Sequence, residues 1–148
     1  MSEIISFEDY LNEYDTLTYT NVGVSMMPLL SQGKDMFTVR KKGPERCEKG
    51  DVVLYRRPPD QYVLHRVVEV RPTSYVILGD NCVYKEYGIT DEDIIGVLTG
   101  YVRGGRAHSI QEPGYRIYTS LIMATMPLRT TGKKFFARAK NIIKRIIK

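Results

Sequence analysis

Three short segments of the chain carry residue types suited to nucleophilic catalysis. Ser25 lies two places after Gly23, and a serine in a glycine-preceded turn exposes its hydroxyl and offers its own N–H to an oxyanion. His65 lies within the apolar run 62–68, and an imidazole needs little tuning to accept a proton at pH 7. Asp80 follows another apolar run, in a Gly-Asp-Asn turn. Taken singly, each has an ordinary alternative: a turn serine or helix cap, a core histidine, and a plain turn.

In this order, the segments resemble boxes of the signal peptidase I family, within the wider group that includes the LexA-type self-cleaving repressors. The resemblance covers about residues 20–103. It implies a β-rich serine peptidase domain that needs no cofactor and acts on a peptide or precursor protein, such as a signal-like or leader peptide. The matching segments are Ser25-Met26-Met27-Pro28, Gly50-Asp51-Val52-Val53, Leu64-His65-Arg66-Val67-Val68, Gly79-Asp80-Asn81 and, more weakly, Ile95-Gly96-Val97.

The resemblance assigns a role to each matching residue. Ser25 would be the nucleophile, His65 the general base, and Asp80 the carboxylate that orients His65 and stabilises its imidazolium. The bacterial form of the family uses a lysine as base, but no lysine occurs between residues 50 and 84. His65 fills that place, as in the archaeal and endoplasmic-reticulum branch. The residues expected to contact substrate are Gly23, Met26 and Pro28.

Two departures from the family pattern leave alternatives open. Gly23 stands where the family usually has a serine that helps to bind the oxyanion. Lys85 and Glu86 stand where members of the histidine type carry an acidic pair, so Glu86 is an alternative or a helper to Asp80. These changes motivate a second hypothesis, that the chain is a catalytically inactive peptide-binding module of the same fold.

The elements that must position these residues are short strands. Five runs rich in Val, Ile, Tyr or Thr predict strands at residues 36–40, 51–56, 61–70, 75–78 and 94–103. Ser6 is expected to cap a short N-terminal helix, and helical spacing predicts two C-terminal helices at residues 115–126 and 133–148. The expected fold is mainly β (α+β), a small antiparallel core of the LexA/signal-peptidase type. Residues 1–112 would form the catalytic domain and residues 113–148 a helical extension.

The charge of the chain is concentrated at its C-terminal end. The net charge is +5, but residues 129–148 contain no Asp or Glu, so the rest of the chain is mildly acidic. Residues 133–148 place apolar side chains on one helical stripe bordered by Lys and Arg. This pattern favours an anionic membrane surface as partner, with packing on the domain or on another protein as alternatives.

Composition excludes several other classes of protein. With 148 residues and 43% hydrophobic residues, the chain is expected to form one globular domain. It shows no signal peptide and no span long enough to cross a bilayer, which predicts a cytoplasmic protein, peripheral at the inner face of the membrane. Cys47, Cys82 and His108 lack zinc-ligand spacing, so no metal is expected. The body lacks an aromatic stacking platform or basic stripe, so no nucleic-acid partner is expected.

Overall fold

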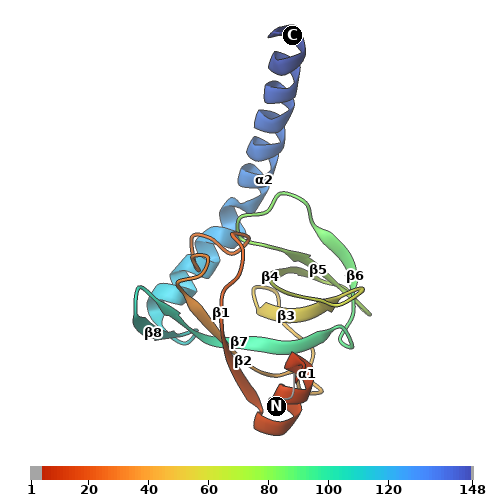
Figure 1. Cartoon of the computed structure of the whole chain (residues 1–148). Helices are drawn as coiled ribbons and strands as arrows, with labels where there is room; N and C mark the ends of the chain where they lie inside the picture. Colours follow the sequence, from red (N-terminus) through yellow and green to blue (C-terminus); the bar gives the residue numbers. More distant parts are fainter. Residues whose placement is uncertain (1–4, 148) are drawn as a thin grey trace.

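A sheet of eight strands lies between a short N-terminal helix and a long C-terminal helix (Figure 1). The computed structural model describes residues 5–147, except for the side chains of residues 129, 133–137, 139, 140, 144 and 147. The elements are α1 (Phe7–Tyr14), β1 (Thr16–Thr20), β2 (Met36–Lys41), β3 (Val52–Arg57), β4 (Gln61–Val70), β5 (Tyr75–Leu78), β6 (Glu86–Ile89), β7 (Ile94–Arg103), β8 (Arg106–Ser109) and α2 (Pro113–Ile147).

The strands follow the order β1-β2-β7-β3-β4-β5-β6, with β8 paired to β7, and each pairing is antiparallel. The predicted fold class, mainly β with helices, is confirmed. The bounds of β4, β5 and β7 are those predicted, and β2 and β3 lie within a residue of the prediction. The strands β1, β6 and β8 were not predicted, because they are short or carry few apolar residues.

The central strands β3 and β4 are covered on both faces. Alternate residues of each strand therefore enter two different apolar clusters. Leu54 and Leu64 belong to the cluster that also receives helix α1 and Tyr115 of α2. Val53 and Val67 belong to the cluster on the opposite face, with Tyr55. The other members of the second cluster are Cys47, Tyr75, Ile77, Ile94 and Val97.

Helix α1 begins and ends as its sequence indicates. Ser6 caps the helix, and its Oγ accepts a hydrogen bond from the N–H of Asp9 at 3.0 Å. At the other end Asp15 adopts a left-handed conformation, with φ of 65°, and its N–H bonds to the carbonyl of Leu11. This turn leads directly into β1, so the helix lies against the strand that precedes Ser25 (Figure 1).

The C-terminal segment forms one helix, α2, so the prediction of two helices is wrong. The expected break between residues 126 and 133 does not occur: the helix continues through Pro127, and a glycine such as Gly132 costs a helix only about 1 kcal/mol relative to alanine. The Thr130 hydroxyl also bonds back to the carbonyls of Met126 and Pro127, at 2.9 and 3.2 Å. The blue end of α2 projects beyond the sheet in Figure 1. Among the described residues, no helix is long and apolar enough to span a membrane.

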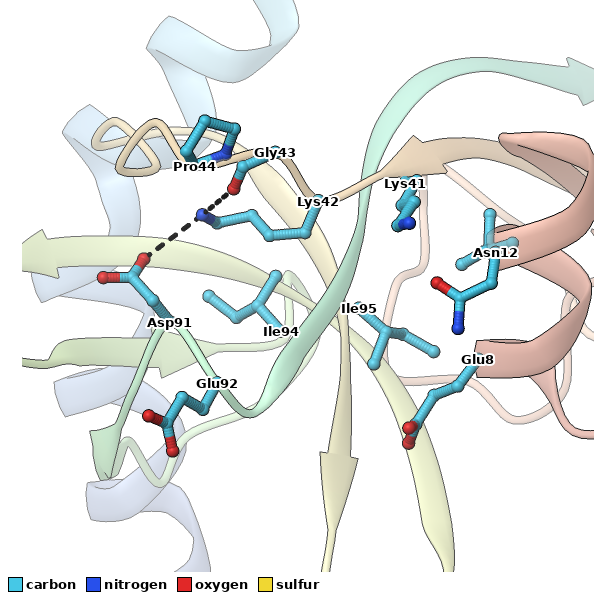
Figure 2. A pocket seen from close by; sticks show the side chains of 11 residues that line it. Glu8, Asn12, Lys41, Lys42, Gly43, Pro44, Asp91, Glu92, Ile94 and Ile95 are labelled. Carbon is cyan, nitrogen blue, oxygen red and sulfur yellow. Dashed lines mark hydrogen bonds and ion pairs between the residues drawn. The ribbon is translucent and has the colours of Figure 1, made fainter.

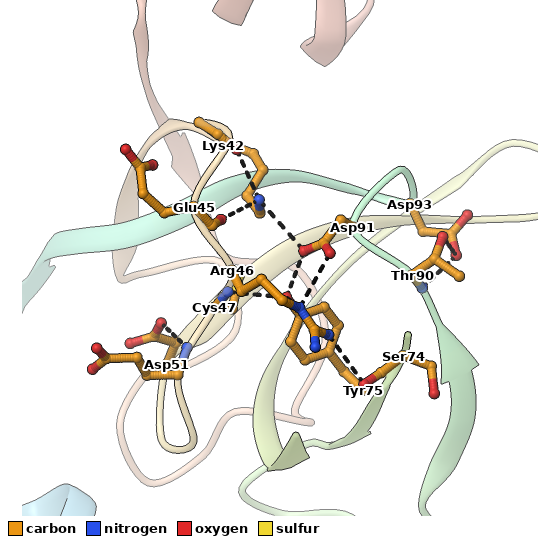
Figure 3. A network of polar contacts seen from close by, with 12 residues as sticks. Lys42, Glu45, Arg46, Cys47, Asp51, Ser74, Tyr75, Thr90, Asp91 and Asp93 are labelled. Atoms are coloured by element: carbon orange, nitrogen blue, oxygen red, sulfur yellow. Dashed lines mark hydrogen bonds and ion pairs between the residues drawn. The ribbon is translucent and has the colours of Figure 1, made fainter. Parts of the chain in front are cut away.

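A polar network fastens the loop between β2 and β3 to the far end of the sheet (Figure 3). The guanidinium of Arg46 lies over the Tyr75 ring, 4.5 Å from its centroid, and its Nε is 3.3 Å from Asp91. Asp91 also accepts a hydrogen bond from the Tyr75 hydroxyl and forms an ion pair with Lys42 at 3.4 Å. The N–H of Cys47 bonds to the same hydroxyl at 3.0 Å. These contacts are structural, since they lie on the segment that leads into β3 and involve none of the predicted site residues.

Candidate active site

The loop that carries Ser25 joins β1 to β2 and is closed at its base by two buried polar residues. Asn21 donates its N–H to the carbonyl of Asp35 at 2.8 Å. The Asp35 carboxylate accepts hydrogen bonds from the N–H of Ser31 at 2.7 Å and from that of Gly104 at 3.2 Å. The Ser31 bond outweighs burial and lowers the pKa of Asp35, so the carboxylate is ionised at neutral pH. The base of the loop is therefore fixed.

Within this loop, Ser25 lies at the start of a tight turn. Gly23 has φ of +85°, a conformation that glycine adopts without steric cost. Met26 is only 1% exposed and packs in the core with Leu30, and the N–H of Leu30 bonds to the carbonyl of Met26 at 3.0 Å. Ser25 is half-buried, and Pro28 is exposed. Of the three predicted substrate contacts, Met26 thus anchors the loop, Gly23 shapes it, and Pro28 is on the surface.

The Gly-Asp-Asn turn is joined directly to the Ser25 loop. Asn81 donates its N–H to the carbonyl of Ser25 at 2.8 Å and its side-chain amide to the carbonyl of Val24 at 3.1 Å. A Cβ atom at Gly79 would lie 2.8 Å from the Ser25 carbonyl oxygen and 3.0 Å from His65 Nε2. Gly79 is thus the point where the Ser25 loop, the Gly-Asp-Asn turn and strand β4 meet. We call this the Gly79 junction.

His65 is buried on β4, opposite Val53 of β3. Burial lowers its pKa to about 4; the charges of Glu86 and Asp80 oppose this, and that of Arg57 adds to it. The imidazole is consequently neutral at pH 7 and has a lone pair to accept a proton. In the described part of the chain no hydrogen bond joins the Ser25 hydroxyl to His65. Such bonds are often long in free enzymes and tighten when substrate binds.

The partner of the second ring nitrogen of His65 is Tyr55, a residue that no sequence motif indicated. The Tyr55 hydroxyl lies 3.3 Å from His65 Nδ1. Burial, the largest cause, raises the pKa of Tyr55, so the hydroxyl keeps its proton. Arg57 Nη2 lies 3.4 Å from the same hydroxyl and forms an ion pair with Glu86. The register offers a signal for Tyr55: it lies two residues beyond Val53, the partner of His65, and therefore on the same face.

Asp80 has a different hydrogen-bond partner from the predicted one. Its carboxylate accepts two parallel bonds from Arg66, at 2.8 and 2.9 Å, and one from the Tyr118 hydroxyl at 2.8 Å. Arg66 and Asp80 are 0% and 2% exposed, so this is a buried ion pair on the face of β4 opposite His65. The negative charge of Asp80 opposes the lowering of the His65 pKa by burial. The group that faces His65 Nδ1, however, is the Tyr55 hydroxyl. The Tyr55 hydroxyl is thus a further group that can orient His65, and orientation by Asp80 stays a prediction.

The Arg66–Asp80 pair also fastens α2 to the sheet. Arg66 Nη1 donates to the carbonyl of Gly50 at 2.8 Å and to the Thr119 hydroxyl at 3.2 Å. Tyr118 reaches Asp80 from the same helix. Because an unpaired buried charge is strongly unfavourable, these contacts make the pair a structural support of the turn that contains Gly79.

Within residues 5–147, two main-chain edges beside the Ser25 loop have no strand partner. In this part of the chain β1 pairs with β2 alone, and the first half of β4, residues 61–65, pairs with β3 but not with β5. Between these edges is a cavity of about 80 Å³, lined by residues of β1, β2, β3 and β4 together with the start of the Ser25 loop. The lining residues are Phe7, Tyr19, Thr20, Asn21, Val22, Phe37, Leu54, Tyr62 and Leu64.

A larger cavity of about 360 Å³ lies elsewhere, between α1 and the end of β2 (Figure 2). Two lysines, Lys41 and Lys42, line it. Lys42 is held by the Asp91 carboxylate and by the carbonyls of Gly43 and Glu45. No disulfide joins Cys47 to Cys82, and the described residues contain no group of three or more His, Cys, Asp or Glu side chains placed to hold a metal.

The comparisons with known proteins add no family assignment. No protein-family model matches the chain, and no curated protein matches its sequence. The functional assignment therefore rests on the residues and on their arrangement around Gly79.

Proposed function

We propose that the protein is a serine endopeptidase that hydrolyses a peptide bond with Ser25 as nucleophile and His65 as general base. The observation that carries this proposal is the Gly79 junction, which holds the Ser25 backbone and His65 Nε2 against the same glycine. A buried, neutral histidine beside a half-buried serine at a tight turn has the properties of a base and a nucleophile. The same three segments are those that resemble the signal peptidase I family.

In the proposed reaction, the Ser25 hydroxyl oxygen attacks the scissile carbonyl carbon while its proton passes to His65 Nε2. The resulting imidazolium gives that proton to the leaving amine, which departs and leaves an acyl-enzyme on Ser25. A water molecule then attacks the ester while His65 accepts its proton, and His65 returns that proton to the departing Ser25 oxygen, which releases the acid and the free serine. The Ser25 N–H would donate a hydrogen bond to the oxyanion. Tyr55 holds the Nδ1 side of the ring throughout.

The proposed substrate is an extended peptide, such as the leader of a precursor protein. An extended chain adds a strand to a free sheet edge through main-chain hydrogen bonds. The edges of β1 and of residues 61–65 flank the small cavity and lead directly to Ser25 and His65. This arrangement supports a peptide lying beside β4 with its scissile bond at the Gly79 junction.

The test is cleavage of a peptide library by the purified protein, followed by mass spectrometry. We expect products from the wild type at pH 7 and none from Ser25→Ala or His65→Ala. The matched controls are Ser120→Ala, an exposed serine on α2, and His108→Ala, the other histidine, which bonds to Glu112. Both controls should cleave like the wild type. Cleavage that persists in Ser25→Ala would contradict the proposal.

The second candidate function is binding of a peptide without cleavage. Gly23 replaces the family serine, and its φ of +85° disfavours any side chain there. Peptides that bind but are never cut in a Ser25-dependent way would identify an inactive peptide-binding module and refute the peptidase.

We further propose that the C-terminal part of α2 binds an anionic membrane surface, which would make the protein cytoplasmic and peripheral at the inner face. Ile142, Ile143 and Ile146 are 57, 53 and 77% exposed on this helix, and Arg138 and Arg145 are exposed beside them. Part of the predicted stripe, at residues 133–137, 139, 140, 144, 147 and 148, lies outside the described side chains. Each cation near such a surface contributes about 1 kcal/mol.

Vesicle flotation tests this membrane proposal. The full chain should float with vesicles of phosphatidylcholine and phosphatidylglycerol, less so with phosphatidylcholine alone, and less at high salt. A chain ending after Gly132 should remain in the bottom fraction, without vesicles. Equal flotation of the two chains would exclude a role for residues 133–148.

A further inference from the structure

Cys82 brings a thiol to the Gly79 junction. A Cβ atom at Gly79 would lie 2.7 Å from Cys82 Sγ and 3.0 Å from His65 Nε2, so the sulfur and the ring nitrogen are separated by no more than the sum of these two distances. A thiol beside an imidazole is the pair of groups from which cysteine nucleophiles are built. Cys82 is therefore a second group, besides Ser25, that has His65 as a neighbouring base.

The turn that carries Cys82 is fixed by its backbone. The N–H of Cys82 bonds to the carbonyl of Gly79 at 2.9 Å, and the N–H of Asn81 bonds to that of Ser25 at 2.8 Å. The side chain of Cys82 packs against the apolar cluster that contains Leu78, and the residue is half-buried. The turn thus holds the thiol at the junction, in a residue that solvent reaches in part.

The His65 ring offers a proton acceptor at the same point. His65 is buried, with 7% of the residue exposed, and its Nδ1 faces the Tyr55 hydroxyl at 3.3 Å. Among the described residues no hydrogen bond occupies Nε2, the nitrogen that lies at the junction. Because burial lowers the pKa of His65 to about 4, the imidazole is neutral at neutral pH and accepts a proton. A buried nitrogen in this state assists a neighbouring thiol when its sulfur attacks an electrophile.

Cys47 lies in a contrasting environment. It is 6% exposed, it belongs to the core cluster that contains Tyr55, and its N–H bonds to the Tyr75 hydroxyl. Burial raises the pKa of the Cys47 thiol, which disfavours the reactive thiolate. The chain therefore contains its own reference: one thiol that burial makes inert, and one that lies beside a base.

We propose that Cys82 is a modification site: a low-molecular-weight disulfide reacts with its thiol, with His65 Nε2 as proton acceptor, and the attached group closes the peptidase site. The inhibition rests on the proposed function. The modification does not, because it needs His65 as a base for the thiol and not as a base for Ser25.

The proposed modification is one thiol–disulfide exchange. The Cys82 proton passes to His65 Nε2 while Sγ attacks one sulfur of the disulfide, whose S–S bond breaks as a new one to Cys82 forms. The leaving thiolate takes the proton from the imidazolium and departs as a thiol, so His65 returns to its neutral form. Cys82 is oxidised, and the departing half of the disulfide is reduced. An added thiol reverses the exchange.

An adduct on Cys82 lies where the scissile bond would lie in the proposed reaction. The group attached to Sγ begins beside the point that is 2.8 Å from the Ser25 carbonyl oxygen and 3.0 Å from His65 Nε2. A tripeptide such as glutathione is far larger than the thiol hydrogen that it replaces, so it obstructs the approach of a peptide to both groups. Modification is therefore expected to stop cleavage.

The test measures where and how fast the full chain reacts with oxidised glutathione at neutral pH. Each adduct is located and quantified over time by mass spectrometry of proteolytic fragments. We expect Cys82 to react about ten-fold faster in the folded protein than in urea, and Cys47 to react more slowly in the folded protein. A half-buried thiol without a base would react more slowly when folded, so reaction of Cys82 that is no faster in the folded protein would overturn the inference.

A pair of variants tests the role of the imidazole. His65→Asn should lower the reaction rate of Cys82 in the folded protein about ten-fold. His108→Asn changes the other histidine, which bonds to Glu112, and should leave that rate unchanged. An unchanged rate in a folded His65→Asn protein would overturn the inference. If His65→Asn fails to fold, the comparison of the folded and unfolded wild type decides.

Cleavage separates this inference from the proposed function. The wild type should lose Ser25-dependent cleavage when Cys82 is modified and regain it with dithiothreitol, while Cys82→Ser should keep cleaving in oxidised glutathione. Modification of Cys82 at the expected rate in a protein that never cleaves would refute the peptidase and keep the modification site. Cleavage that persists in the fully modified wild type would keep the peptidase and overturn the inhibition.

Discussion

Replacing Gly79 with alanine is the substitution that most directly disturbs the junction between the segments that carry Ser25, Asp80 and His65. The added Cβ would lie 2.7 Å from Cys82 Sγ, 2.8 Å from the Ser25 carbonyl oxygen and 3.0 Å from His65 Nε2, whereas ordinary contact begins at 3.4 Å. The Cys82 side chain can rotate away. The Ser25 carbonyl is backbone, and it already accepts the Asn81 N–H at 2.8 Å, so it moves only with its loop.

The expected cost has two parts. Overpacking of this size destabilises a folded protein by about 1–3 kcal/mol, which leaves a domain of ordinary stability folded at 25 °C. Moving the Ser25 carbonyl from 2.8 to at least 3.4 Å displaces the nucleophile relative to His65. Because a misplacement of about 1 Å reduces a rate by roughly 100-fold, kcat/KM should fall about 10- to 100-fold.

The assay combines kcat/KM for a cleaved peptide with urea unfolding of the same preparation. The matched control is Gly114→Ala, because a Cβ at Gly114 meets nothing within 4 Å. This control should keep the wild-type kcat/KM and lose no stability. A Gly79→Ala protein with wild-type activity and stability would refute the close approach of the three segments.

Four further predictions concern the groups around the junction. Tyr55→Phe removes the hydroxyl that faces His65 Nδ1, a bond of about 0.5–1.5 kcal/mol, and should lower kcat about three- to ten-fold with little change in the unfolding midpoint. Asp80→Asn leaves Arg66 buried without its carboxylate and should lower the free energy of unfolding by about 3–5 kcal/mol in urea; a loss below about 1 kcal/mol would deny the pair its structural role. Because burial lowers the pKa of His65 to about 4, kcat/KM should rise with pH through about 4 rather than 6.5. For the same reason, the free energy of unfolding should fall by about 3 kcal/mol as pH falls from about 6.5 to 4, since the unfolded chain binds the His65 proton first. Asp35→Asn should destabilise the protein at pH 7, and since the folded pKa of Asp35 is lowered, its difference from the wild type should shrink as pH falls below about 3.9.

The apolar strands of the fold were predictable from sequence. Residues 61–70, 75–78 and 94–103 combine β-branched and aromatic residues with flanking turn signals, and the structure has strands with those bounds. The strand Arg106–Ser109 has no such signal. It forms because the left-handed Gly104 and Gly105 turn the chain back onto β7, so tertiary pairing decides its conformation.

The site was predictable in part, for a physical reason. Ser25 and His65 carry the types of side chain that catalysis needs, and motif order was enough to pair their segments. The partner of Asp80 was not visible in the sequence, because it depends on which face of β4 the turn approaches. Arg66 points to the face opposite His65, and its charge draws the carboxylate there.

Tyr55 illustrates the complementary difficulty. In the sequence, Tyr55 fits the pattern of a buried apolar strand and gives no sign of a polar role. The register of β3 against β4 is what brings its hydroxyl to His65. Cross-strand register depends on the whole sheet, so a polar contact made through it leaves no local pattern in the sequence.

The most direct test of the peptidase account is a crystal structure of the protein with a peptide boronic acid that ends in an alanine-sized group. We expect a covalent bond between boron and Ser25 Oγ, with His65 Nε2 within about 2.6–3.2 Å of that oxygen or of a boronate oxygen. Boron bound to another residue, or a Ser25 adduct with His65 remaining out of hydrogen-bond reach, would contradict the proposed catalytic pair.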